Sequence, residues 1–170
     1  KKLNLKIKYR EGFRPFAPIV LVADVSDFFE HNDIAPYMLI VKPVKKSRQI
    51  PYPADFQSKE LLQKLYFLRS YMPAITHVDY SARLQTIHRE TNERLWKLLQ
   101  SFKSKTGYPV LVNTSFNVRG EPIVNTPEDS YRCFMRTDMD FLVVGNFIFD
   151  KTKQPEWLEK DDWKTEFTLD

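Results

Sequence analysis

Short runs of branched apolar residues alternate along this chain with stretches in which leucines recur at helical spacing. The runs at 17–23 and 37–42 are typical of buried strands. The run at 109–116 is predicted to be a strand that passes directly into polar residues, and the run at 140–150 to be a last long strand. The apolar pattern therefore predicts strands along the whole chain.

Helices are expected between these strands. One is predicted over 58–70, with Ser58 as N-cap and its apolar side formed by Leu61, Leu62, Leu65 and Leu68. The clearest helix spans 85–105, and Gly107 is placed to end it. Its apolar residues are Ile87, Leu95, Leu98, Leu99 and Phe102.

A further helix begins at Thr126-Pro127-Glu128-Asp129, which combines a capping Thr, a Pro at the first helical position and two acidic residues in the first turn. The first ten residues fit either an alternating strand or a helix end. Strands alternating with helices indicate an α/β fold. We expect a single domain over 1–150 and a charged tail, 151–170, that packs on it through Trp157 and Trp163.

Composition narrows the class of protein. The chain is 42% hydrophobic and 28% charged, as in soluble globular proteins. No apolar run approaches the roughly 20 residues of a membrane span, and the start lacks the features of a signal peptide. The lone Cys133 excludes an intrachain disulfide and multi-cysteine metal sites, and the three histidines have no metal-ligand spacing. We expect a cytoplasmic protein without a metal site in this chain.

Charge is concentrated at the beginning of the chain. The net charge is +4, and residues 1–14 hold six basic residues against Glu11 alone. This distribution favours a local anion site over a surface that coats nucleic acid, and a solvated basic arm is the alternative. The four glycines fit neither a GxGxxG turn nor a GxxxxGK[ST] loop.

Candidate chemistry lies in three polar segments, the first of which holds Lys8, Arg10 and Arg14. On an extended chain Lys8 and Arg10 point to one side and clamp a polyphosphate. Surface ion pairing with Glu11 is the alternative.

The second segment, 77–85, places Arg83 just before the predicted long helix, where it would reinforce an anion site at the helix N-terminus. An Asp79–Arg83 pair that braces a turn is the alternative. His77 is expected to be a hydrogen-bonded structural residue, because no Gly-x-Ser-x-Gly elbow accompanies Ser81.

The third segment, 113–121, is a polar cluster at the end of a buried strand, where open α/β sheets bind ligands. Asn113, Ser115 and Asn117 share one parity, so they face the same way if the chain stays extended. Amides and a hydroxyl there suit nucleotide phosphates or a small amide-like substrate. Turn-forming Asn and Ser residues are the alternative.

Together these segments resemble the carboxy-terminal region of the O-carbamoyltransferases. The matching stretches are N-x-x-x-K-x-R-E-x-F-R-P-F-A-P at 4–18, H-V-D-x-S-A-R-L-Q-T at 77–86, P-V-L-V-N-T-S-F-N-V-R-G-E-P-I-V at 109–124 and T-P-E-D at 126–129. The resemblance implies a YrdC-like α/β domain, with a mixed twisted sheet flanked by helices. Because the chain begins without Met and lacks the family's amino-terminal domain, we expect it to be a fragment of a longer protein.

The resemblance also implies a transferase reaction. ATP with Mg²⁺ and carbamoyl phosphate would form carbamoyl-adenylate here. A separate amino-terminal, actin-like ATPase domain, which would carry any iron or other metal, would then pass the carbamoyl group to a hydroxyl of a small molecule or sugar. By resemblance, Lys8, Arg83, Asn113 and Ser115 are the catalytic residues, and nucleotide contacts extend to Arg10, Arg14, Asn117 and Arg119.

Besides the missing amino-terminal domain, one residue and one segment depart from the family pattern. Tyr80 stands where a small residue is expected and would narrow the site, and the segment 43–70 looks like an insertion. Residues 43–57, which include three prolines, are predicted to be a surface loop. Two other functions stay open: a non-catalytic nucleotide- or RNA-binding module, and a structural module that stabilises its missing partner. Binding to a membrane is not expected, and binding to nucleic acid is less favoured than catalysis.

Overall fold

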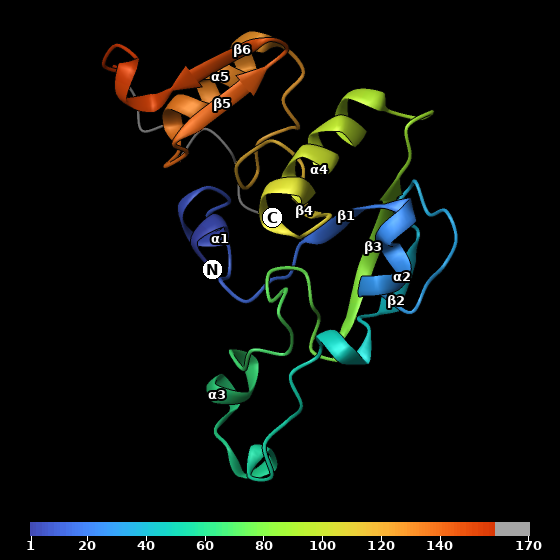
Figure 1. Cartoon of the computed structure of the whole chain (residues 1–170). Coiled ribbons are helices and arrows are strands. Elements are labelled where there is room, and N and C mark those ends of the chain that lie inside the picture. Colours follow the sequence, from blue (N-terminus) through green and yellow to red (C-terminus); the bar gives the residue numbers. More distant parts are fainter. Residues whose placement is uncertain (159–170) are drawn as a thin grey trace. The chain divides into compact units, whose positions relative to one another are not determined.

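A mixed four-stranded sheet organises the middle of the chain in the computed structural model, which describes residues 1–158 (Figure 1). The chain divides into two compact units. The sheet unit is Pro15–Thr114, and the hairpin unit combines Lys1–Arg14 with Ser115 and the residues that follow. The α/β architecture with a mixed sheet that the sequence predicts is confirmed.

The sheet has the strand order β2-β3-β1-β4. Strand β1 (Ala17–Leu21) runs parallel to β3 (Ser81–Ile87) and antiparallel to β4 (Val110–Asn113), and β2 (Ile40–Pro43) runs antiparallel to β3. A short helix, α2 (Val25–Phe28), follows β1. Because β1 and β3 are the two inner strands, the apolar side chains on them are the most deeply buried part of the sheet.

Helix α4 (Glu93–Thr106) packs on this sheet through its apolar side. Leu99, fully buried, joins Ile19, Leu21 and Ile87 in one core cluster. The helix begins at Asn92, whose side chain accepts a hydrogen bond from the Leu95 amide at 3.0 Å. It ends, as the sequence predicts, at Gly107, which takes the left-handed conformation with φ +77°.

The start of that helix is predicted wrongly. Residues 85–87 belong to β3, and α4 begins only at Glu93. The reason is visible in the burial of β3, where Ala82, Leu84 and Thr86 are buried at period 2. Ile87 fits both the strand period and the helical period, so the sequence pattern joined two elements into one.

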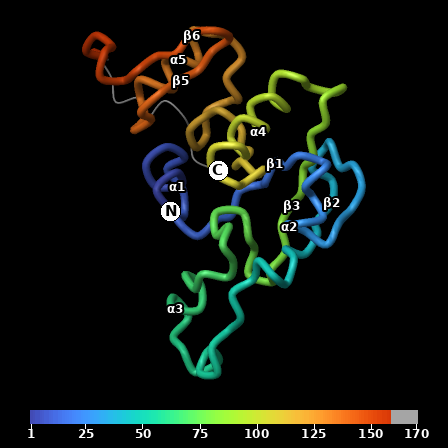
Figure 2. Tube along the Cα trace, viewed as in Figure 1, coloured from blue at the N-terminus to red at the C-terminus, as the bar shows by residue number. Residues whose placement is uncertain are grey.

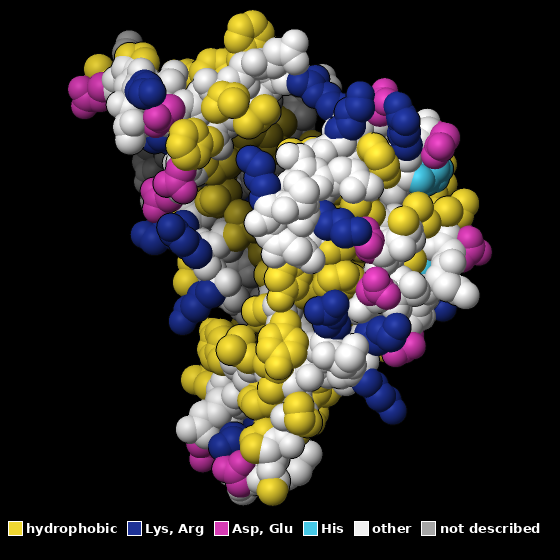
Figure 3. Space-filling view, viewed as in Figure 1, with side chains coloured by type: hydrophobic (Ala, Val, Ile, Leu, Met, Phe, Trp, Pro, Cys, Tyr) yellow, Lys and Arg dark blue, Asp and Glu magenta, His cyan; other side chains and the backbone are white. Residues whose placement is uncertain are grey.

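Residues 44–76 leave the sheet and return to it as an extended arm (Figure 2). The predicted helix over 58–70 shrinks to α3 (Leu61–Leu65), and its N-cap is Glu60 rather than Ser58. Leu61 and Leu62 are exposed, so no core forms against their side of the helix. Hydrophobic side chains gather at the surface of this arm (Figure 3).

An aromatic cluster and one arginine hold the arm together. The ring of Tyr52 stacks on Phe56 with centroids 3.9 Å apart. The buried Arg69 guanidinium donates to the Tyr52 hydroxyl and to the carbonyl oxygens of Lys64, Leu65, Phe67 and Val78. Tyr80, at φ +65°, packs edge-on against Tyr52 and donates its hydroxyl to the Ile50 carbonyl, so it anchors this arm.

The hairpin unit begins with helix α1 (Lys2–Lys6), which decides the ambiguous first ten residues in favour of a helix. Helix α5 (Pro127–Arg136) starts with the predicted cap: Thr126 and Asp129 form a capping box. The predicted strand over 140–150 is wrong in one respect, because it is two antiparallel strands, β5 (Phe141–Val144) and β6 (Phe147–Asp150). The chain turns between them at Gly145, with φ +60°.

Of the predicted tail anchors, Trp157 lies 6.0 Å from the Tyr131 ring, measured between centroids. Trp163 lies outside the described residues. No helix in the described part of the chain is both long and apolar enough to cross a bilayer.

Candidate functional site

Lys8 lies at the centre of the polar site in the hairpin unit. Lys8 is 6% exposed and lies two residues after the end of α1. The next residue, Tyr9, has a positive φ of +47°. The ammonium donates to Ser115 Oγ at 3.2 Å, to Asn117 Oδ1 at 2.8 Å and to the Asn117 carbonyl at 2.9 Å. It also donates to the Ser115 carbonyl. The structure thus joins Lys8 to Ser115 and Asn117, two predicted site residues that lie more than a hundred positions further along the sequence.

The loop that follows Ser115 fixes the orientation of these groups. Asn117 Nδ2 donates to the Glu121 carbonyl at 2.7 Å, and the Val118 amide donates to Glu121 Oε2 at 2.8 Å. A carbonyl oxygen only accepts, so Asn117 Oδ1 faces the other way. There it accepts from Lys8 and from the Ser115 hydroxyl, which lies 2.6 Å away.

Burial shapes the electrostatics of this loop. Desolvation, helped by the nearby charge of Arg10, lowers the pKa of Lys8 to about 8. Burial and the Glu121 carboxylate raise the pKa of the Cys133 thiol to about 12. At neutral pH Lys8 is therefore cationic, and the Cys133 thiol is neutral.

Three arginines lie near the Glu11 carboxyl, and one of them, Arg119, belongs to the same loop. The pKa of the Glu11 carboxyl is lowered by a hydrogen bond from its own backbone and by the charges of Arg119, Arg14 and Arg10. The ion pair between Arg14 and Glu11, 3.7 Å long, is the surface pairing that the sequence left open. Both side chains in that pair are about half exposed, so the contact is weak.

The extended conformation expected at Lys8 and Arg10 is wrong, and their clamp on a polyphosphate stays a prediction. Arg10 Nε donates to Asn4 Oδ1 at 2.7 Å, while Lys8 turns to Ser115 and Asn117. The chain is not extended at this point, because Tyr9 has a positive φ. Asn4 is only 1% exposed. It begins the first motif, but the sequence pattern does not identify it as a partner of Arg10.

The sheet unit holds the other predicted residues. Arg83 is an exposed residue of β3, opposite Val41 of β2, so its predicted place at a helix N-terminus is wrong. Gln85, two residues further along β3, shares its face. Asn113 ends β4 and donates through Nδ2 to Gln85 Oε1. The sequence pattern does not single out Gln85, because its contact with Asn113 lies between different strands.

The parity argument for the third segment is also wrong. Strand β4 ends at Asn113, so Ser115 and Asn117 do not continue it. Asn113 contacts Gln85 within the sheet unit, whereas Ser115 and Asn117 contact Lys8 within the hairpin unit.

His77, Asp79 and Ser81 form a separate hydrogen-bonded turn. The Ser81 hydroxyl donates to Asp79 Oδ1 at 2.6 Å and lies 2.9 Å from His77 Nδ1. Hydrogen bonds from Ser81 lower the pKa of the Asp79 carboxyl. Asp79 is therefore braced by Ser81, and no ion pair joins it to Arg83 among the described residues.

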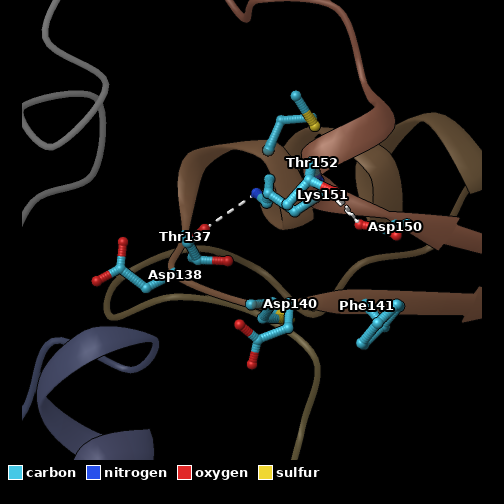
Figure 4. Close-up of a pocket in the computed structure, with 9 residues that line it drawn as sticks. Thr137, Asp138, Asp140, Phe141, Asp150, Lys151 and Thr152 are labelled. Carbon is cyan, nitrogen blue, oxygen red and sulfur yellow. Dashed lines mark hydrogen bonds between the residues drawn. The ribbon is translucent and has the colours of Figure 1, made fainter.

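An open hollow of about 730 Å³ lies elsewhere in the hairpin unit (Figure 4). Asp138, Asp140 and Asp150 lie around Lys151, whose ammonium donates to the Thr137 carbonyl at 3.0 Å. None of the predicted site residues lines this hollow. Within residues 1–158, no three His, Cys, Asp or Glu side chains come together as metal ligands.

Comparison with known proteins agrees with the motifs. Residues 1–151 match the family model described as the carbamoyltransferase C-terminus. An uncharacterized protein of Synechocystis is 56% identical over 99% of this chain and 27% of its own length. The nodulation protein NolNO of Sinorhizobium fredii is 40% identical over 95% of this chain and 21% of its own length.

A relative with a named reaction is the 3'-hydroxymethylcephem-O-carbamoyltransferase of Amycolatopsis lactamdurans. It is 32% identical over 89% of this chain and 25% of its own length. The chain thus spans about a quarter of the length of these relatives. It belongs to the carbamoyltransferase family and corresponds to the carboxy-terminal domain of the O-carbamoyltransferases.

Proposed function

We propose that this domain binds ATP and carbamoyl phosphate and forms carbamoyl-adenylate for O-carbamoylation. The observation that carries the proposal is the Lys8 ammonium, held by Ser115 and Asn117 in the same unit as three arginines. Clustered cations that are fixed in place before the ligand arrives suit a polyphosphate. The similarity to the O-carbamoyltransferase of Amycolatopsis lactamdurans supports a carbamoyl group as the transferred unit.

The proposed reaction has two steps. Water hydrolyses carbamoyl phosphate to carbamate and phosphate. A carbamate oxygen then forms a bond to the α-phosphorus of ATP, the bond from that phosphorus to the bridging oxygen breaks, and pyrophosphate leaves. Carbamate attacks as an anion, so no general base is needed. Mg²⁺ accompanies ATP as part of its substrate complex.

Positive charge is the main contribution of the protein to this step. Lys8, Arg10, Arg14 and Arg119 neutralise the reacting and leaving phosphates in the hairpin unit. Arg83 adds a guanidinium in the sheet unit, where Asn113 supplies an amide that can orient the carbamoyl group. Ser115 Oγ donates to Asn117 in this structure, so it acts on a ligand chiefly by keeping Lys8 in place.

The acceptor and the second half-reaction belong to the rest of the protein in this proposal. A further amino-terminal, actin-like ATPase domain, including any iron or other metal it carries, would transfer the carbamoyl group to a hydroxyl of a small molecule or glycan. The relatives are about four times as long as the matched region, which leaves room for such a domain in them.

Thermal unfolding of this chain with Mg·ATP tests the proposal. Saturation at 100 times the dissociation constant stabilises a fold by about 2.7 kcal/mol, and pyrophosphate release then reports the chemistry. Lys8→Met and Arg83→Met should abolish the stabilisation by ATP. Lys97→Met, a matched control on the exposed face of α4, should retain it. Unchanged stabilisation in both site variants, or none in the unmodified chain, contradicts the proposal.

A further inference from the structure

The amide of Asn113 is oriented by a chain of hydrogen bonds that ends on the backbone. Gln85 Nε2 donates to the Pro36 carbonyl at 2.8 Å. A carbonyl oxygen cannot donate, so the Gln85 amide cannot turn around without losing this bond. Gln85 Oε1 therefore faces Asn113, and the group of Asn113 that meets it must be the Nδ2 donor.

This orientation determines the position of the other polar atom of the Asn113 side chain, its carbonyl oxygen Oδ1. With Nδ2 held by Gln85, the carbonyl oxygen Oδ1 points away from this contact. Within the described residues of the sheet unit, no group donates to Asn113 Oδ1. Asn113 is half-buried, so a bound molecule can reach this oxygen.

The order of the sheet makes the contact possible. Asn113 of β4 lies opposite Ala17 of β1, and Gln85 of β3 lies opposite Ile19 of β1. The two amides therefore meet over β1, beside Ala17, whose methyl group leaves room for them. The loop before β2 closes the chain of contacts, because Asn113 Nδ2 also lies 3.7 Å from the sulfur of Met38, a residue at φ +54°.

We infer that Gln85 is a positioning residue that makes Asn113 an acceptor for the amino group of the carbamoyl substrate. The inference rests on the proposed function. Carbamoyl phosphate carries an NH₂ donor close to a phosphate anion. The same sheet face offers an acceptor oxygen on Asn113 and a guanidinium on Arg83, whose side chain leaves β3 on the side of Gln85. An acetyl group has a methyl group in place of the amino group, so it leaves the Asn113 oxygen without a partner.

Gln85→Leu removes the contact to Asn113, and Gln85→Glu loses the bond to the Pro36 carbonyl but keeps an oxygen that can accept from Asn113 Nδ2. Gln49→Leu is the matched control, because Gln49 donates to the Val44 carbonyl elsewhere in the same unit. Side-chain amide resonances of ¹⁵N-labelled protein should show one bonded, slowly exchanging Nδ2 proton of Asn113. That signal should persist in Gln85→Glu and Gln49→Leu and disappear in Gln85→Leu. If it is unchanged in Gln85→Leu, the positioning role is overturned.

The second measurement is pyrophosphate release with carbamoyl phosphate and with acetyl phosphate. The unmodified chain, Gln85→Glu and Gln49→Leu should prefer carbamoyl phosphate, and Gln85→Leu should lose at least about tenfold of that preference, since an unpaired polar group is what rejects the analogue. Equal use of both phosphates by the unmodified chain overturns the role in selecting the amino group. If neither phosphate supports release, the proposed function fails, and the amide resonances still decide the positioning role.

Discussion

The side-chain amide of Asn117 donates to the Glu121 carbonyl at 2.7 Å, and this contact turns its oxygen toward Lys8. The loop thereby builds an acceptor site for the ammonium before any ligand is present. Lys8 has three protons for four oxygens of Ser115 and Asn117, so its charge is held at a fixed position. In the proposed function, a phosphate bound here would meet a cation that does not need to be ordered first.

Replacing Asn117 should therefore cost stability as well as affinity. Asn117→Ala removes one acceptor of a buried ammonium and leaves the Glu121 carbonyl without its donor. Leaving buried polar groups unpaired costs about 1–3 kcal/mol, which chemical denaturation would measure as a lower free energy of unfolding. Asn125→Ala, at an exposed position, is the control. Equal unfolding free energies in the two variants would contradict this role of Asn117.

The arm should depend on a single side chain in the same way. Arg69→Met removes a buried guanidinium that serves four carbonyl oxygens and one hydroxyl. A hydrogen bond to a charged donor contributes about 1.5–3 kcal/mol, so we expect a loss of at least about 2 kcal/mol. Limited proteolysis should then cut within 44–76. Arg89→Met, which loses an exposed pair with Glu93 and a contact with the Trp96 ring away from the arm, should not increase cleavage there.

The elements that the sequence predicted well are those with local signals. Thr126, Pro127 and Asp129 begin a helix through contacts within one turn, and Gly107 ends one through its own backbone conformation. Elements that depend on distant partners were misjudged. Ile87 joins a strand because β1 lies beside it, and the pattern of β3 alone does not reveal that neighbour.

The residues of the candidate site also divide into those that local motifs identify and those that depend on distant strands. The motifs identified Lys8, Ser115 and Asn117, and the structure brings them together, although a turn at Tyr9 and not an extended chain does so. Gln85 was missed because its contact with Asn113 depends on the order of three strands. The alternation of side chains along a strand places Gln85 on the same face as Arg83. It cannot show that β4, which carries Asn113, lies two strands away from β3 in the sheet.

The turn between β5 and β6 is not predicted by the apolar pattern, and its dependence on Gly145 can be tested. Gly145 has φ +60°, and a Cβ there would meet no atom within 4 Å. Gly145→Ala should therefore cost only the backbone strain of about 1–2 kcal/mol, measured by thermal unfolding. Gly12→Ala, where φ is not positive and the nearest atom to a Cβ is 3.4 Å away, should change stability less. A larger loss at Gly12 would show that crowding, not backbone conformation, dominates.

Nucleotide binding should weaken as the pH rises through about 8, because burial and the charge of Arg10 lower the pKa of Lys8 to about that value. Below it the side chain is an ammonium that attracts phosphate, and above it a neutral amine. The dissociation constant for Mg·ATP should increase by up to about tenfold per pH unit above the pKa, since binding requires the protonated form. Lys8→Arg should bind with little dependence on pH between 7 and about 10, because a guanidinium stays charged.

The weaker binding of Mg·ATP at high pH cannot result from unfolding caused by deprotonation of Lys8, because deprotonation of Lys8 changes the free energy of unfolding in the opposite direction. The pKa of Lys8 in the folded chain lies below the ordinary value of 10.5, so between about 8 and 10.5 the unfolded chain binds more protons at this group. The contribution of Lys8 to stability therefore rises with pH across this window, while affinity for ATP falls. Calorimetric titrations at several pH values, each paired with a denaturation curve, separate the two effects. Parallel pH profiles for the unmodified chain and Lys8→Arg would show that another group controls binding.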